Sequence, residues 1–216
     1  QYQYISSYVQ ECENVMRASV GLNDYQALSA YIDIPSFVGK YLVEEVSKNI
    51  DSSATSQYFY KDRDGLLYAG PVWDYDWAYG VERIQGEIDY TDPEGFSARD
   101  IPGSLIWWQL LYYNNAFYED VVTMYENVLY PWLNELVETG LNQWAQELSA
   151  RAVMDYLRWD RAASETDTAA SDDTSASDDA ASSPVQKAYQ AYQEQVEQVR
   201  SFLSVRKEFL YREWVG

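Results

Sequence analysis

The chain has 216 residues, and its 35 acidic side chains outnumber its 15 basic ones, which gives a formal net charge of −20. This charge repels phosphate backbones and anionic lipid headgroups, so the composition argues against nucleic-acid binding and against membrane-surface binding. Cys12 is the one cysteine and histidine is absent, which excludes an internal disulfide, a Cys/His zinc site and any catalysis by a histidine base.

Helical spacing of apolar residues marks the first part of the chain. Between Ile5 and Met16 it predicts a one-faced amphipathic helix that ends near Gly21. A second helix is predicted to begin after Asp33, because Pro35 then falls in the first turn, where its missing N–H costs nothing. We expect this helix to end within residues 49–51.

A β-hairpin is predicted next. Two short β-rich runs, at residues 56–61 and 66–72, flank the sequence Asp62-Arg63-Asp64-Gly65. An Asp-Gly pair between two such runs is a strong hairpin signal. Residues 81–103 then carry Gly, Pro and Asp at irregular spacing, which predicts a long loop.

The remainder of the chain is predicted to be helical. The apolar run at 105–113 indicates a helix buried on all sides, and residues 117–129 indicate another helix that Pro131 interrupts. Residues 137–156 and 189–210 indicate two long helices. Their aromatic stripes are typical of core packing rather than of a sugar or cofactor platform.

The segment 164–183 separates those last two helices. It has six acidic residues, no basic residue and no aromatic ring, so it cannot bury enough apolar surface to fold alone. We expect a flexible acidic insertion within a single domain that spans residues 1–216. The fold class is therefore predicted to be α+β and mainly helical, with a small β-hairpin that carries the acids of the site and with no membrane span.

Acidic residues after the hairpin carry the strongest chemical signal. Asp74 and Asp76 follow an apolar strand and lie two residues apart, so in an extended segment their carboxylates face the same way. Two such oxygen ligands suit Mg²⁺, Mn²⁺ or Ca²⁺. Asp51 lies at the end of the preceding helix. The two short strands could return the chain so that Asp51 lies in one cleft with Asp74 and Asp76. From spacing alone, a structural role for Asp76 explains the pattern equally well.

Several motifs along the chain form a recognisable set. They are Tyr31-Ile32-Asp33-Ile34 with Phe37, Glu44-Glu45, Asn49-Ile50-Asp51, Tyr58 to Asp62, Gly70-Pro71-Val72-Trp73-Asp74-Tyr75-Asp76 with Gly80, residues 102–117, and Phe202-Leu203-Ser204-Val205-Arg206 with Phe209. Together these motifs resemble the CotH kinase-like family, which includes spore-coat kinases, secreted bacterial proteins and surface proteins of some fungi. The resemblance covers nearly the whole chain, and the combination of Asn-x-Asp with Gly-Pro-Val-Trp-Asp-x-Asp is specific.

The resemblance implies the C-terminal lobe of an atypical protein-kinase-like fold that transfers the γ-phosphoryl group of ATP to Ser or Thr of a protein. Asp51 matches the catalytic acid of the family, and Asp74 matches its metal-binding acid for Mg²⁺ or Mn²⁺. Asn49 is expected to bind cofactor and Asp76 to bind metal, because they adjoin those residues. Phosphoryl transfer requires a metal ion and an orienting carboxylate but no histidine, so the composition agrees with this activity.

The resemblance also places the start of the chain inside the family's domain. We therefore expect an upstream segment or a second chain to supply the N-terminal lobe, and an extracellular, cell-surface or spore-coat location. One alternative is a non-catalytic surface, coat or cellulosome-type binding module with the same fold. A carbohydrate-active protein ranks last, because Asp74 and Asp76 are too close together to flank a glycosidic bond.

Overall fold

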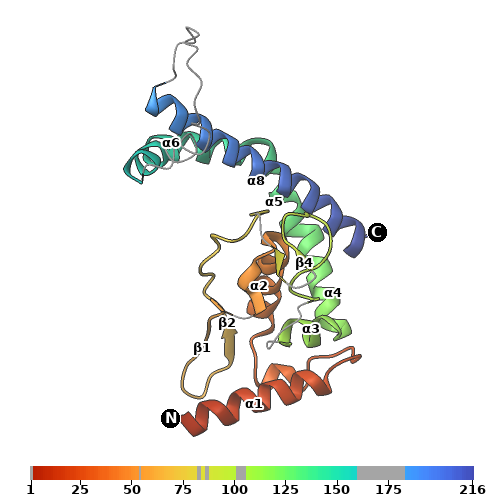
Figure 1. Ribbon diagram of the computed structural model, residues 1–216. Coiled ribbons are helices and arrows are strands. Elements are labelled where there is room, and N and C mark those ends of the chain that lie inside the picture. The colour runs from red at the N-terminus through yellow and green to blue at the C-terminus, as the bar shows by residue number, and fades with distance from the viewer. Residues whose placement is uncertain (1, 54, 82–83, 86–87, 101–105, 160–182) are drawn as a thin grey trace. The chain divides into compact units, whose positions relative to one another are not determined.

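The computed structural model describes residues 2–53, 55–81, 84–85, 88–100, 106–159 and 183–216 (Figure 1). The chain divides into two compact units, one of Gln1–Leu133 with Phe202–Gly216 and the other of Asn134–Ser201. The described residues are mainly helical, with two small antiparallel sheets of two strands each, which confirms the mainly helical prediction. None of their helices has the length and apolar character needed to cross a membrane.

The first unit begins with the two predicted helices. Helix α1 (Tyr2–Ala18) buries Cys12 and Met16, and a short 3-10 helix η1 (Leu28–Ala30) follows. Helix α2 (Ile34–Ser47) starts where Asp33 caps it, since the Asp33 Oδ1 atom accepts a hydrogen bond from the Ser36 N–H at 2.9 Å. It ends at Lys48, whose φ of 49° is left-handed. The 3-10 helix η2 (Ile50–Ser53) comes next.

The predicted hairpin is present but shorter than expected. Strand β1 (Phe59–Lys61) pairs with β2 (Leu67–Ala69), and the Gly65 N–H closes the turn on the Asp62 carbonyl at 3.1 Å. The second strand stops at Ala69 because Gly70 has a φ of 140° and the following proline has no N–H for the ladder. Leu67 exchanges backbone hydrogen bonds with residues 31 and 33, which attaches the hairpin to the chain just before α2.

The predicted loop at 81–103 contains a second, unpredicted pair of strands. Strand β3 (Ile84–Gln85) pairs with β4 (Ile88–Asp89), and the alternation of a two-residue strand is too short to detect in the sequence. Residues 90–100 have no helix or strand. Residues 101–103 lie outside the described residues.

Helices complete the first unit. They are α3 (Trp107–Tyr112), α4 (Asn115–Met124), the π-helical turn η3 (Tyr125–Leu129) and the first part of α5 (Tyr130–Glu135), up to Leu133. The prediction that Pro131 interrupts the helix is wrong, because Pro131 lies within α5. In the preceding turn the Tyr130 N–H bonds to the Tyr125 carbonyl, five residues back. This wider π turn leaves room for a proline ring that would clash in a regular α-helix.

The core of the first unit is aromatic. Tyr41 of α2 is fully buried, and its ring centroid lies 6.2 Å from that of Trp108, 6.0 Å from that of Phe117 and 6.4 Å from that of Trp214. Trp214 comes from the end of helix α8 (Pro184–Trp214). In Figure 1, α2 lies between the β1–β2 hairpin and the helices α3 and α4. The central position of α2 lets it hold chain segments on several sides.

The second unit contains the π-helical turn η4 (Leu136–Gly140), α6 (Leu141–Arg158) and the first part of α8. The Tyr192 hydroxyl donates a hydrogen bond to the Ala145 carbonyl at 3.0 Å. Tyr156 is buried, as its place on the predicted apolar stripe requires, but Trp144 and Leu148 of the same stripe are half exposed, so that part of the core prediction is wrong. Ala145, which was not part of the predicted stripe, is buried. Except for Ser183, the predicted insertion at 164–183 lies outside the described residues, and the single domain over 1–216 stays a prediction.

Candidate active site on helix α2

One face of α2 holds the segment that follows the hairpin. Its polar residues lie three or four positions apart, and therefore on one side of the helix: Ser36, Lys40, Glu44 and Ser47. The Ser36 hydroxyl accepts a hydrogen bond from the Ala69 N–H at 3.2 Å, and the Ser47 carbonyl accepts one from the Tyr79 N–H at 2.8 Å. Residues 69–79 therefore follow α2 from its first turn to its last.

Glu44 is the centre of the contacts on this face. Its buried Oε1 atom lies 2.8 Å from the Lys40 Nζ atom and accepts hydrogen bonds from the Tyr75 hydroxyl at 2.7 Å and the Gln57 amide at 3.0 Å. Its Oε2 atom accepts a hydrogen bond from the Asn49 amide at 3.1 Å. Lys40 also donates to the Tyr75 hydroxyl at 3.0 Å. A buried carboxylate needs such partners, because an unpaired charge in the interior is very costly.

Tyr75 joins the loop to this buried group. Burial raises the pKa of its hydroxyl far above the ordinary value, and the nearby negative charge of Glu44 raises it further. The phenol is therefore neutral at all physiological pH values, and it can donate its proton to Glu44 while it accepts from Lys40.

The predicted catalytic segment leaves the same helix end. The Asn49 side chain is fully buried, and its Oδ1 atom accepts a hydrogen bond from the Asp51 N–H at 3.2 Å. Asp51 itself is half-buried at the start of η2. Burial raises the pKa of the nearby loop residue Tyr90, and the charges of Glu45 and Asp51 add to the effect.

The structure corrects the predicted geometry of the acidic pair. Asp74 and Asp76 do not lie on the strands of the hairpin but in the loop after it, and the segment is not extended, because Asp74 has a left-handed φ of 66°. Both aspartates are exposed, whereas Tyr75 between them reaches Glu44. The Asp74 Oδ2 atom accepts a hydrogen bond from the Ser56 hydroxyl at 3.1 Å. This contact joins Asp74 to the segment that begins with Asp51.

The exposed aspartates fit a metal ion that arrives with a nucleotide. Within the part of the chain that the structure describes, no group of three or more acidic or cysteine side chains is placed to enclose a metal ion. A dedicated protein cage is not needed for Mg²⁺, which is usually held by one or two carboxylates together with substrate phosphates and water. Asp74 and Asp76 offer carboxylate oxygens of this kind.

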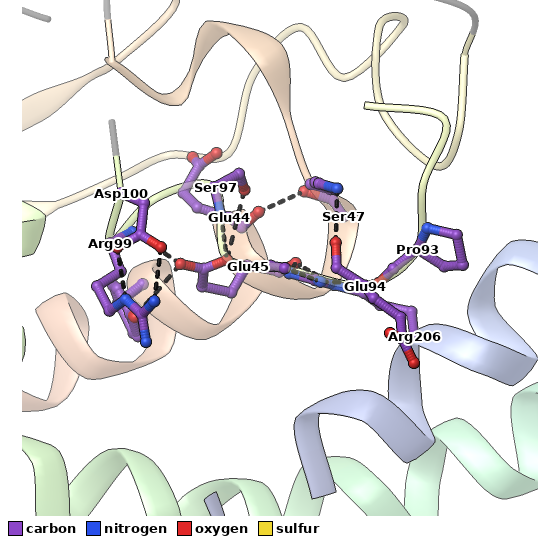
Figure 2. Close-up of polar contacts among 12 residues, drawn as sticks. Glu44, Glu45, Ser47, Pro93, Glu94, Ser97, Arg99, Asp100 and Arg206 are labelled. Atoms are coloured by element: carbon purple, nitrogen blue, oxygen red, sulfur yellow. Dashed lines mark hydrogen bonds and ion pairs between the residues drawn. The ribbon is translucent and has the colours of Figure 1, made fainter. Parts of the chain in front are cut away.

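Glu45, the neighbour of Glu44 on α2, holds a different loop (Figure 2). Its carboxylate accepts hydrogen bonds from the Ser97 N–H at 2.9 Å, the Arg99 N–H at 2.7 Å and the Arg206 guanidinium at 3.0 Å. Arg206 is fully buried and donates also to the carbonyls of Glu45 and Pro93. Burial lowers the pKa of Arg206, and the charge of Glu45 opposes this shift. The pair therefore fixes residues 93–99 beside α2.

Lys48 adds a second cation under the same loop. At the end of α2 its Nζ atom donates hydrogen bonds to the backbone carbonyls of Asp89 at 2.8 Å, Glu94 at 2.7 Å and Asp92. Burial, together with the charge of Arg206, lowers the pKa of Lys48 to about 8. The loop after β4 is thus built around two buried cations.

Sequence reasoning assigned no role to the residues that organise this site. Glu44, Glu45 and Arg206 were noted only as parts of motifs, and Lys40 was not noted. One signal was available, because two adjacent glutamates interrupt the apolar residues 41–46 of a buried helix and must find partners there. The position of Lys40 four residues before Glu44 identifies one of those partners.

A family model described as CotH kinase protein matches residues 1–210 of the chain. The match includes all four predicted site residues, which are Asn49, Asp51, Asp74 and Asp76. Searches of curated proteins and of solved structures gave no match.

Proposed function

The chain belongs to the CotH kinase protein family, and from this premise we propose that it carries the catalytic acids of a metal-dependent protein kinase. The proposed reaction transfers the γ-phosphoryl group of ATP to a Ser or Thr hydroxyl of a protein. The main supporting observation is that one helix, α2, holds both the segment of Asp51 and the loop of Asp74, and that Ser56 links the two.

The proposed roles follow from exposure and chemistry. Asp51 orients the acceptor hydroxyl and receives its proton, a role that needs a carboxylate in reach of solvent. Asp74 holds the metal ion and Asp76 assists it. Asn49 was expected to bind cofactor, but its side chain is fully buried, so its proposed role is to position Asp51 through the hydrogen bond to the Asp51 N–H. A bound Mg²⁺ or Mn²⁺ neutralises the charge of the phosphates.

The acceptor in this proposal is a coat or surface protein, and the location is extracellular, at the cell surface or in a spore coat. Membership in the CotH kinase protein family is the support for both proposals. A protein with a net charge of −20 attracts basic acceptor segments, which electrostatic steering would bring to the acidic site.

A non-catalytic surface, coat or cellulosome-type binding module is the alternative. Trp73 and Tyr58 favour it, because both rings are about half exposed beside Asp74 and contact each other with centroids 6.1 Å apart. Exposed aromatic clusters are common in protein-binding surfaces.

A phosphoryl-transfer assay with radiolabelled ATP, Mn²⁺ and a library of Ser- and Thr-containing peptides tests the proposal. Asp51→Asn removes the proposed base and should lower transfer by about a hundredfold or more. Asp74→Ala should abolish it, while Glu147→Gln, an exposed change on α6, should leave it unchanged. Transfer that survives in both aspartate variants would reject these roles, and binding of surface proteins without any transfer would favour the alternative.

A further inference from the structure

We infer that Glu44 is a positioning residue that sets the placement of Asp51 relative to Asp74, and this inference rests on the proposed function. Its side chain is fully buried, so it is placed to act through other residues rather than on the nucleotide or the metal ion. Its two carboxylate oxygens hold two different chain segments. That division of contacts is the basis of the inference.

The first contact reaches the loop of the metal-binding aspartate. The Glu44 Oε1 atom accepts the Tyr75 hydroxyl at 2.7 Å, and Tyr75 lies directly between Asp74 and Asp76. The half-buried Tyr75 reaches Glu44 on α2, while its two neighbours are exposed. Fixing Tyr75 therefore fixes the backbone from which both carboxylates project.

The second contact reaches the segment of the proposed catalytic aspartate. The Glu44 Oε2 atom accepts a hydrogen bond from the side-chain amide of Asn49 at 3.1 Å. The side-chain oxygen of Asn49, Oδ1, in turn accepts a hydrogen bond from the Asp51 N–H at 3.2 Å. Two hydrogen bonds therefore connect Glu44 to the backbone of Asp51. A carboxylate group is rigid and planar, so its two oxygens hold the two segments at a defined separation.

Only a carboxylate satisfies every partner on this face. Tyr75, Gln57, Asn49 and Lys40 all donate to Glu44. Glutamine has one oxygen that accepts and one NH₂ group that donates. In Glu44→Gln the NH₂ group would therefore face a side chain that also donates, whichever way the amide is turned. Lys40 supplies the positive charge that stabilises the buried carboxylate of Glu44. Lys40 is itself buried, with only 4% of its surface exposed.

Tyr75→Phe tests the contact to the loop, because it removes the hydroxyl and keeps the ring. The matched control is Tyr79→Phe, which removes a hydroxyl group from the same loop. Among the described residues, no hydrogen bond to the Tyr79 hydroxyl is seen, in contrast to that of Tyr75. We would measure Mn²⁺ binding by electron paramagnetic resonance and hydrogen exchange of the amides at 73–79. Tyr75→Phe should weaken Mn²⁺ binding about tenfold and speed exchange in this segment, while Tyr79→Phe does neither.

Glu44→Gln tests both contacts together. It should speed hydrogen exchange at residues 49–51 as well as 73–79, and raise the Mn²⁺ concentration needed for half-maximal transfer while also lowering the maximal rate. If Glu44→Gln does not fold, Asn49→Ser replaces it for the Asp51 segment and Tyr75→Phe for the loop.

The outcomes separate this inference from the proposed function. Unchanged exchange in both segments of the variants would overturn the positioning role of Glu44, even if the wild type binds metal and transfers phosphate. Faster exchange in the variants, with a wild type that binds no Mn²⁺ and transfers nothing, would support the positioning role and reject the proposed function. Faster exchange together with weaker Mn²⁺ binding would support both.

Discussion

At the scale of single residues, Gly80 ends the loop of the site at a position that admits no side chain. Its φ is 85°, and a Cβ atom there would lie 2.8 Å from the Cδ2 atom of Phe202. Gly80→Ala should therefore lower the free energy of unfolding by about 2 to 4 kcal/mol, from backbone strain and overpacking together.

Gly39→Ala is the matched control for this substitution. Gly39 lies inside α2, and a Cβ atom added there would meet no neighbouring atom within 4 Å, so alanine should stabilise the protein by about 0.5 to 1 kcal/mol. Urea denaturation of both variants measures the two effects. Equal effects of the same sign would contradict the assigned role of Gly80.

Buried and exposed ion pairs should differ sharply in how much they contribute to the stability of this protein. The side chains of Arg206 and Glu45 are fully buried, whereas those of Arg212 and Glu94 are more than half exposed. Arg206→Met leaves the Glu45 charge buried without its cation and should cost about 3 to 5 kcal/mol. Arg212→Met should cost about 1 kcal/mol or less. Thermal unfolding compares the two, and similar losses would contradict the account of the loop at 93–99.

At the scale of elements, α2 depends on its N-cap. The Asp33 carboxylate accepts the Ser36 N–H at 2.9 Å, and the Asp33 N–H bonds to the Leu67 carbonyl, which attaches the hairpin. Asp33→Ala should cost about 1 kcal/mol because it removes the cap but keeps the backbone bond to the hairpin. Asp33→Asn should retain most of the stability, since asparagine caps equally well. Chemical denaturation of the pair checks this, and a full loss in Asp33→Asn would contradict the capping role.

Local signals in the sequence were sufficient for the elements around the site. Asp33 with Pro35 predicted the start of α2, and Asp64-Gly65 predicted the hairpin, because caps and turns depend on a few neighbouring residues. Pro131 was misinterpreted, since a π turn has no sequence signature that distinguishes it from a helix end.

The arrangement of the site could be predicted only in part. The motif drew attention to Asp51 and Asp74, but the contacts that join their segments come from residues up to 31 positions apart in sequence, as for Glu44 and Tyr75. The left-handed φ of Asp74 also could not be foreseen from the neighbouring residues in the sequence. Long-range contacts of this kind leave no local pattern.

At the scale of the whole molecule, buried tyrosines should set the alkaline limit of stability. Burial raises the pKa of Tyr41 and of Tyr125 well above the ordinary value, so both stay neutral in the folded protein. The same groups in the unfolded chain release protons near pH 10. The contribution of these two tyrosines to the free energy of unfolding is therefore complete below about pH 10, and it is lost as the pH rises toward the folded-state pKa. Circular dichroism and tyrosinate absorbance should change together above this pH, and complete tyrosinate formation in a folded protein would contradict the prediction.

The most direct test of the proposed site is a calorimetric titration of ATP with Mn²⁺ into the protein and into Asp74→Ala. The account predicts binding that requires Mn²⁺ in the wild type and is lost in the variant, with an unchanged circular dichroism spectrum. Binding that is equally strong in Asp74→Ala, or that does not require the metal ion, would contradict the assignment of this loop as the metal and nucleotide site.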